Sequence, residues 1–321
     1  TRIVFVLGGQ GSQYFGMCQQ LLQYSNVWSS TFRLCSKILF DLHPNLFSNN
    51  QTLLELLENA HQSLLTEEEF HSTQVCQPLL FSIEYSLGKM LMAWGITPDY
   101  MIGHSIGEIV AACLSSAISL EDALFLVGHR AQFMEQTIEG SMLAINCDVE
   151  QFNQLCQQLH LNQLEVSLAG HNGIRSIVVS GLAKTIDILH SHITTNKLFL
   201  CKKLNIKHPF HTHFMKPILN EFRSIANRII YKKCKIAIID TLNGQLRTQF
   251  NAQYWSDQIE QTVQFHSALS YLYNLSIKEK FQPICIELSP TPILLQYLTE
   301  SERNFQTYSI LRKNRNDFEQ I

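Results

Sequence analysis

A serine that could act as a nucleophile stands in a polar insertion within the mostly apolar stretch 99–120. Residues 103–107 read G-H-S-I-G and fit the pattern G-x-S-x-G, which is typical of a sharp turn between a strand and a helix. Glycines on both sides leave room where the turn crowds the chain, and the amides that open the helix favour an oxyanion beside the serine. The pattern predicts that Ser105 is a nucleophile, against the alternative of an idle serine at a helix start.

A serine nucleophile needs a base, and the densest group of the thirteen histidines lies at 207–215. This segment holds His208, His211 and His213, and their spacing neither selects one of them nor excludes a metal pair. No nearby acidic or cysteine side chain completes a zinc site. The sequence therefore predicts a histidine base in this segment without fixing which one.

The elements that must position these residues alternate between strands and helices, which favours a parallel α/β sheet. The predicted strands lie at 3–7, 99–103, 235–244 and 283–288, and a glycine-rich turn at 8–13 follows the first of them. The predicted helices lie within 16–60 and at 72–95, 106–117 and 120–137. The helix at 72–95 has apolar residues at helical spacing after Ser/Thr capping candidates, so we expect it to be long and buried.

From about residue 139 the pattern changes to short elements in the order βαββαβ. The strands are predicted at 141–147, 164–170, 176–181 and 198–206, and the helices at 149–159 and 182–193. This order is that of the split βαβ, or ferredoxin-like, arrangement. Residues 139–206 are therefore predicted to form a small subdomain inserted into a larger α/β unit.

The composition limits the class of protein. The 321 residues are 45% hydrophobic and carry a net charge of −3 with no large basic cluster, which argues against nucleic-acid or anionic-membrane partners. Nine scattered cysteines without a CxxC pair indicate reduced thiols, and the N-terminus has no signal-peptide pattern. The one long apolar stretch contains His104, Ser105 and Glu108, which excludes a transmembrane helix. We expect a soluble cytoplasmic protein.

Six motifs together resemble a known family. They are GQGSQ at 9–13, QP at 77–78, GHSIGE at 103–108, arginine at 130, HPFH at 208–211 and SPTPIL at 289–294. Their order is that of the malonyl-CoA:acyl carrier protein transacylases, and they resemble even more closely the acyltransferase domains of polyketide synthases. The resemblance runs from residue 3 to about residue 318, and the tail at 309–321 resembles the linker that follows such domains. Gly8 and the Ser-Pro-Thr at 289–291 depart from the usual family pattern.

The resemblance implies the fold class α/β, with an α/β-hydrolase-like large subdomain built around a parallel sheet. That subdomain would comprise 1–138 and 207–321, and the ferredoxin-like small subdomain would comprise 139–206. The second part agrees with the element order read directly from the residues.

The resemblance also implies roles for particular residues. Ser105 matches the nucleophile and His211 the general base, with the backbone carbonyl of Gln258 in place of an aspartate to orient the imidazole. Gln10 and Ile106 would supply the backbone N–H groups of the oxyanion hole. Such a carbonyl would accept from one ring nitrogen and leave the other free for the serine proton.

The same resemblance implies a substrate pocket. Arg130 matches the arginine that binds the free carboxylate of a dicarboxylic acyl group, for which a planar guanidinium is suited. Gln77 and His104 are placed at the same pocket. Phe210, beside the base in an HPFH motif similar to the HAFH of malonyl-selective domains, would fill the space that an α-methyl group needs, so malonyl is the predicted unit.

The implied reaction is ping-pong transfer of malonyl from malonyl-CoA, through a seryl ester, to the phosphopantetheine thiol of an acyl carrier protein. It serves polyketide or fatty acid biosynthesis and needs no bound cofactor or metal. The expected partners are the carrier protein, a ketosynthase and other polyketide synthase domains. The alternatives are an acyl hydrolase of the same fold, an ordinary α/β-hydrolase esterase and a carrier-docking module with a degenerate site. Arg130 argues against the first and the inserted segment against the second, while retention of Ser105, His211, Arg130 and Gln10 argues against the third.

Overall fold

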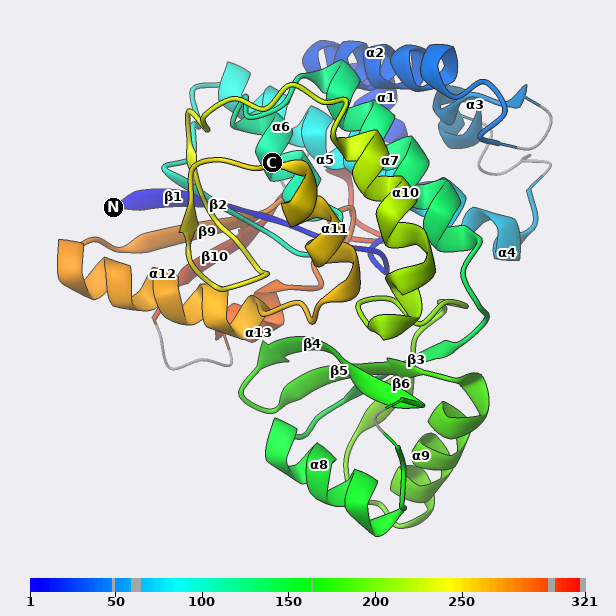
Figure 1. The fold of residues 1–321 in the computed structure, drawn as a ribbon. Coiled ribbons are helices and arrows are strands. Elements are labelled where there is room, and N and C mark those ends of the chain that lie inside the picture. Colours follow the sequence, from blue (N-terminus) through cyan, green and yellow to red (C-terminus); the bar gives the residue numbers. More distant parts are fainter. Residues whose placement is uncertain (48–49, 59–64, 163, 300–303, 318–321) are drawn as a thin grey trace.

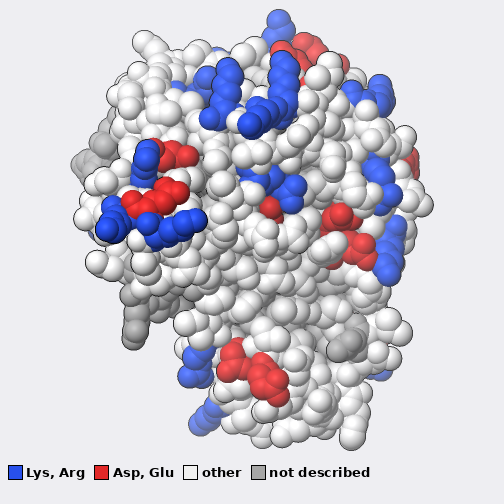
Figure 2. Space-filling model, turned by 60° about the vertical axis from the view of Figure 1, so that its left-hand side comes forward, with Lys and Arg blue, Asp and Glu red and all other residues white. Residues whose placement is uncertain are grey.

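The structure, a computed structural model, describes residues 1–47, 50–58, 65–162, 164–299 and 304–317. The end of the helical stretch predicted within 16–60 and the last residues of the tail predicted at 309–321 lie outside the described residues. Within those ranges, no helix is both long and apolar enough to cross a membrane. Figure 2 shows one face of the surface, on which small groups of basic and acidic side chains are separated by wide areas without charge.

The larger sheet has six strands in the order β10-β9-β1-β2-β7-β8. All neighbours pair in parallel except β7 and β8, which are antiparallel. The strands are β1 (Arg2–Leu7), β2 (Tyr100–Gly103), β7 (Ala237–Ile239), β8 (Leu246–Arg247), β9 (Pro283–Glu287) and β10 (Gln306–Ser309). The short edge strands β8 and β10 were not predicted, because two to four residues with mixed polarity give no periodic signal.

Helices cover both faces of this sheet (Figure 1). Along β1 the side chains of Phe5 and Leu7 enter one apolar core, and those of Val4 and Val6 enter another on the opposite face. Alternation with apolar residues on both faces is the pattern of a fully buried parallel strand. The second core is closed by α12 (Phe265–Glu279) and α13 (Leu295–Thr299). The first is closed by α1 (Gln19–Tyr24), α2 (Asn26–Leu42), α3 (Leu53–Glu58), α4 (Glu67–Phe70), α5 (Thr73–Ala93), α6 (Gly107–Leu114), α7 (Leu120–Glu135), α10 (Lys216–Ala226) and α11 (Ala252–Glu260).

A second sheet, antiparallel throughout, is built from residues between α7 and α10. Its order is β4-β5-β3-β6, from β3 (Ser141–Ile145), β4 (Val166–Gly173), β5 (Ser176–Gly181) and β6 (Cys201–Lys203). Two helices, α8 (Val149–Gln158) and α9 (Ala183–Thr195), pack on one face of it (Figure 1). The strand order is that of the split βαβ arrangement. The predicted fold class, α/β with a parallel sheet and a separate antiparallel sheet, is confirmed.

One predicted strand is much shorter than expected. The sequence indicated a strand over 198–206, and only Cys201–Lys203 pairs as β6. Each flank of this edge strand keeps one main-chain hydrogen bond, from the amide of Asn146 to the carbonyl of Leu200 and from the amide of Leu204 to the carbonyl of Met142. The side chain of Leu200 is nevertheless 80% exposed, although its apolar character suggested a buried position. The residues that follow β6 leave the sheet and lead to the segment 208–211 that the sequence singled out.

Candidate active site

Ser105 lies in the turn between β2 and α6, in a backbone conformation that few residues adopt. Its φ is 54°, in the left-handed region. A Cβ at Gly103 would lie 2.3 Å from the amide nitrogen of Glu108, and one at Gly107 would lie 2.5 Å from the carbonyl oxygen of Leu7. The two glycines are therefore required because the turn is pressed against its own helix and against β1. Such strained backbone is concentrated at functional sites.

His211 is the histidine that reaches this serine. Its Nε2 lies 2.9 Å from the Oγ of Ser105, and its Nδ1 lies 3.0 Å from the main-chain carbonyl oxygen of Gln258. Since a carbonyl only accepts, Nδ1 carries the proton and Nε2 is free to accept from the serine hydroxyl. His211 also has a positive φ, of 57°. The other two histidines of the segment point elsewhere: His208 faces Glu135, and His213 begins the 3-10 turn His213–Met215.

Burial, the charge of Arg130 and that of His104 lower the pKa of His211 to about 3. The imidazole is therefore neutral at pH 7, which is the form that can accept a proton. Burial also lowers the pKa of His104. Among the described residues, no group of three or more His, Cys, Asp or Glu side chains could hold a metal ion.

Arg130 projects from α7 into the centre of the site and is almost fully buried. Its Nη1 donates to Oε1 of Gln77 at 2.6 Å, and its Nη2 donates to Oγ of Ser105 at 3.1 Å and to Oε1 of Gln258 at 3.3 Å. Nε of Arg130 is buried and has no partner within the described ranges. Gln77, on α5, also donates to Oε1 of Gln10 at 3.2 Å.

The charge of this guanidinium is not neutralised by the protein around it. No ion pair in the described part of the chain includes Arg130, and its contacts are two neutral amides and a hydroxyl. Burial lowers its pKa to about 9, while Glu108 acts in the opposite direction. Arg130 is therefore charged at pH 7, and a buried cation of this kind is strongly attracted to an incoming anion.

Two backbone amides are free beside the serine. Gln10 lies in the turn after β1, and Ile106 immediately precedes the first residue of α6. Neither amide donates a hydrogen bond within the residues that the structure describes. Both belong to segments that meet at the end of the parallel strands, where a developing oxyanion can be bound.

Asn172 is a site residue that the sequence did not indicate. It lies on β4 of the second sheet, is only 4% exposed, and its Oδ1 is 3.0 Å from Nε2 of His104. The ring of His104 packs at 5.7 Å from that of Phe265. A single asparagine in a strand carries no motif, so only the packing of the two sheets places it here.

A small cavity of about 80 Å³ opens above Ser105 between the two sheets. One wall comes from the larger unit, and the opposite wall is apolar and comes from the second sheet and the chain that follows it. The cavity is lined by Gln10, His104, Ser105, Met142, Ala169, Gly170, Val178, Leu204, Ile206, Phe210 and His211. The structure thus brings together all nine residues that the sequence proposed, with Arg130, Gln77 and Gln258 directly behind the serine and Ile106 following it.

The two departures from the family pattern, Gly8 and Ser289, lie against each other. A Cβ at Gly8 would be 2.2 Å from the Oγ of Ser289 and 3.0 Å from Oε1 of Glu84. The amide of Gly8 donates to that same glutamate at 3.2 Å. The serine side chain occupies the space that a larger residue at position 8 would need, so the two unusual residues compensate sterically.

Comparison with known proteins agrees with this geometry. Residues 4–320 match the acyl transferase domain family. The chain is 33% identical over 311 residues to an orsellinic acid synthase of Armillaria mellea and 30% identical over 319 residues to the mycoketide-CoA synthase of Mycobacterium tuberculosis. These matches cover 93% and 98% of this chain, and the chain spans only 13% and 7% of the length of those two relatives.

Among solved structures, the acyltransferase domain from the second module of the salinomycin polyketide synthase superposes with a TM-score of 0.85. It is 27% identical, and the match covers 99% of this chain and 70% of that one. The parallel sheet and the separate antiparallel sheet are thus part of a fold that this chain shares with that acyltransferase domain. This chain belongs to the acyl transferase domain family, of the type found in polyketide synthases.

Proposed function

We propose that this domain transfers a malonyl group from malonyl-CoA, through an ester on Ser105, to the phosphopantetheine thiol of an acyl carrier protein. The observation that carries the proposal is the uncompensated, buried guanidinium of Arg130, 3.1 Å from the Oγ of Ser105. A cation placed there selects an acyl group that ends in a carboxylate. The hydrogen-bonded Ser105 and His211 supply the nucleophile and its base.

In the first half-reaction, Nε2 of His211 takes the proton of the Ser105 hydroxyl as Oγ attacks the thioester carbonyl carbon. The amides of Gln10 and Ile106 bind the resulting oxyanion. The C–S bond then breaks, and the thiolate of coenzyme A leaves with the proton from His211. The carbonyl of Gln258 stabilises the imidazolium that forms between these steps, since it accepts from Nδ1.

The second half-reaction repeats these steps with another thiol. The phosphopantetheine thiol gives its proton to Nε2 of His211 and attacks the ester carbonyl, and the same two amides bind the oxyanion. Oγ of Ser105 then leaves, takes the proton back from His211, and the malonyl group is carried away as a thioester. Throughout, Arg130 holds the free carboxylate, and Gln77 holds Arg130 through the 2.6 Å contact.

The preference for malonyl over methylmalonyl rests on the cavity wall. Phe210 is 4% exposed, lines the cavity and stacks with the ring of His208 at 5.9 Å. Because Phe210 lines this small cavity beside His211, its ring is the side chain that we expect an α-methyl group to meet. A methyl group in an apolar pocket is worth about 1–3 kcal/mol, so Phe210→Ala is expected to raise the relative use of methylmalonyl-CoA about tenfold or more.

The length of the two relatives indicates which domains and partners this domain works with. The two synthases are many times longer than this chain, so we propose that the domain works beside a ketosynthase and other polyketide synthase domains and shares their carrier protein. We also propose that 139–206 is a subdomain inserted between 1–138 and 207–321, which the separate antiparallel sheet supports. A cytoplasmic location is supported by nine cysteines without a disulfide among them.

Intact-protein mass spectrometry after brief exposure to malonyl-CoA, methylmalonyl-CoA or acetyl-CoA tests this function. We expect a malonyl adduct that is absent in Ser105→Ala, with acetyl-CoA giving little. The matched control is Ser289→Ala, which removes a buried serine hydroxyl that touches no reacting group. Release of coenzyme A without any adduct would indicate the hydrolase instead, and an adduct in Ser105→Ala would refute the assigned nucleophile.

A further inference from the structure

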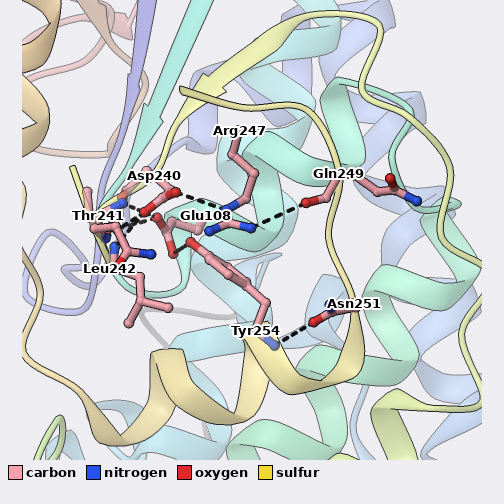
Figure 3. Close-up of polar contacts among 10 residues, drawn as sticks. Glu108, Asp240, Thr241, Leu242, Arg247, Gln249, Asn251 and Tyr254 are labelled. Carbon is pink, nitrogen blue, oxygen red and sulfur yellow. Dashed lines mark hydrogen bonds and ion pairs between the residues drawn. The ribbon is translucent and has the colours of Figure 1, made fainter. Parts of the chain in front are cut away.

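A buried carboxylate lies directly behind the nucleophile turn and takes no part in the reaction described above. Glu108, in the first turn of α6, is fully buried. Its Oε1 accepts from the amide of Thr241 at 2.5 Å and from the hydroxyl of Thr241 at 3.0 Å. Its Oε2 accepts from the hydroxyl of Tyr254 at 2.8 Å. Figure 3 shows these contacts converging from the loop after β7 and from α11.

The carboxylate of Glu108 links the segment around Ser105 to the loop after β7 and to α11. The single proton of the Thr241 hydroxyl is shared between Oε1 of Glu108 and the carbonyl oxygen of Gly103, the last residue of β2, each of which lies 3.0 Å from the hydroxyl oxygen. Tyr254 lies on α11, four residues before Gln258, so the two side chains share a face of that helix. Likewise, Glu108 follows Ser105 by three residues at the start of α6. The contact between Glu108 and Tyr254 therefore lies about one helical turn away from Ser105 along α6 and from Gln258 along α11.

Two contacts consequently join α6 and its turn to α11 at successive levels. At the upper level, Nε2 of Gln258 donates to the main-chain carbonyl of Ser105 at 2.7 Å. At the lower level, Tyr254 donates to Glu108 at 2.8 Å. Between them they fix the separation and the rotation of α11 relative to the turn. That rotation sets where the main-chain carbonyl of Gln258 points, 3.0 Å from Nδ1 of His211.

We propose that Glu108 and Tyr254 are positioning residues that hold α11 so that the carbonyl of Gln258 orients His211 for proton transfer with Ser105. The inference rests on the proposed function in so far as His211 serves as the base. Neither side chain has a hydrogen bond to Oγ of Ser105 or to Nε2 of His211 within the described residues. The pair therefore acts through Gln258.

The cost of burying Glu108 argues that it has more than a packing role. A carboxylate removed from water is retained in a protein interior only with several donors, and an apolar residue would pack there more cheaply. The titratable groups that face it are Asp240 from the end of β7, Tyr254 from α11 and Arg130 from α7. Asp240 is itself paired with Arg247 of β8 at 2.9 Å, which weakens but does not remove its repulsion of Glu108.

The ring of Tyr254 has contacts that do not depend on its hydroxyl. The guanidinium of Arg247 lies 4.2 Å from the ring centroid, and the rings of Phe250 and Trp255 lie at 4.9 and 5.1 Å. Tyr254→Phe therefore removes the lower contact and leaves this packing in place. Glu108→Gln keeps the contact, because its amide oxygen can accept from Thr241 while its NH₂ donates to the tyrosine oxygen. Glu108→Ala abolishes it.

The experiment compares these variants by three measurements. The first is the rate at which a fluorophosphonate modifies Ser105, which requires no acyl donor. The second is kcat and KM for malonyl transfer, and the third is the Nδ1–H resonance of His211 in ¹⁵N-histidine-labelled protein, identified by its loss in His211→Gln. Tyr231→Phe is the matched control, since it removes a half-buried tyrosine hydroxyl bonded to the carbonyl of Ala226 at 2.9 Å.

We expect Tyr254→Phe and Glu108→Ala each to lower kcat and the fluorophosphonate rate about 10- to 100-fold, with KM changed less than about twofold. The Nδ1–H resonance should shift in both, and the double variant should be no slower than either single one, because they remove one contact. Glu108→Gln and Tyr231→Phe should stay within about twofold of the wild type.

Unchanged rates with an unshifted resonance in Tyr254→Phe would overturn the proposal, as would effects that add in the double variant. If Tyr254→Phe fails to fold, the difference between Glu108→Gln and Glu108→Ala decides the same question. A wild type that reacts with the fluorophosphonate and not with malonyl-CoA would refute the proposed donor, while the probe rates and the resonance would still decide the positioning role.

Discussion

The two sheets of this molecule bury very different side chains. The unit around the parallel sheet encloses ionisable groups that are nearly or fully inaccessible, among them Glu84, Glu108, Arg130, Asp240 and Glu287. The antiparallel sheet and its two helices bury an apolar core together with uncharged polar side chains such as Ser180 and Thr185, and none of their described Asp, Glu, Lys, Arg or His side chains is buried. The first region therefore contains the buried charges, and the second contributes mainly apolar packing.

The two regions meet along a narrow seam. The amide of His171 donates to the carbonyl of Val263, and the amide of Val263 donates to the carbonyl of Ala169, both at 2.9 Å. The contact between Asn172 and His104 lies beside this seam. The second sheet therefore reaches the site through backbone pairing, through the polar side chain of Asn172 and through the apolar residues that line the cavity. Substitutions in the two regions should consequently have separable effects, one on chemistry and the other on stability.

The largest expected effect tests the charged region. Arg130→Ala leaves the carboxylate of a bound malonyl group buried without its partner, which costs about 2–5 kcal/mol. We expect kcat/KM for malonyl transfer to fall by about 10²- to 10³-fold, with acetyl transfer little changed, in single-turnover assays with each donor. Arg228→Ala, which removes the guanidinium that lies 5.0 Å above the ring of Phe125, serves as the control and should leave both rates unchanged.

The apolar region should respond in stability and not in chemistry. Leu189→Ala in the core of the second sheet is expected to lower the free energy of unfolding by about 2–5 kcal/mol, because it leaves a cavity. Its neighbour Ile188 is 44% exposed, so Ile188→Ala should change that free energy by no more than about 0.5 kcal/mol. Urea unfolding measures both, and a malonylation rate of folded Leu189→Ala that fell more than a few-fold would contradict the separation.

The pH dependence of stability should reveal the buried carboxylate. Burial and the nearby Asp240 raise the pKa of Glu108 to about 7, above the ordinary value of 4.5. A raised pKa in the folded state means that this group's contribution is complete below about pH 4.5 and is lost as the pH rises through 7. Between pH 5 and pH 8 the wild type should therefore lose about 2–3 kcal/mol relative to Glu108→Gln. If urea unfolding gives the same difference in the free energy of unfolding between wild type and Glu108→Gln at pH 5 and at pH 8, this pKa is wrong.

The smallest expected effect lies at the seam. Asn172→Ala removes the hydrogen-bond partner of His104. The loss of this one hydrogen bond is expected to lower the free energy of unfolding by about 1 kcal/mol. We expect kcat/KM for malonyl-CoA to fall about three- to tenfold and the melting temperature to fall by only about 2–4 °C. Asn196→Ala, on the far end of the same region, is the control. An effect as large as that of Arg130→Ala would mean that the second sheet contributes more than shape.

Much of the fold follows from local patterns. The buried helix predicted at 72–95 is α5 at Thr73–Ala93, and the element order predicted for 141–206 is the one observed. The turn around Ser105 was also predicted, because G-x-S-x-G describes a local steric requirement that the positions of Gly103 and Gly107 make explicit. Gln258 and Arg130 were reached only through the resemblance, since an isolated glutamine or arginine in a helix has no chemical signature.

The sequence by itself determined the elements, the nucleophile turn and the segment that holds the histidine, because these depend on residues within a few positions of one another. The spacing of the three histidines did not select one of them and the resemblance pointed to His211, but the contact between His211 and Ser105, 106 positions apart, is seen only in the tertiary structure. The tertiary structure also decided that Asn172 faces His104 and that Gly8 accommodates Ser289. These contacts depend on how the strands are ordered and how the sheets pack, and no spacing along the chain records that.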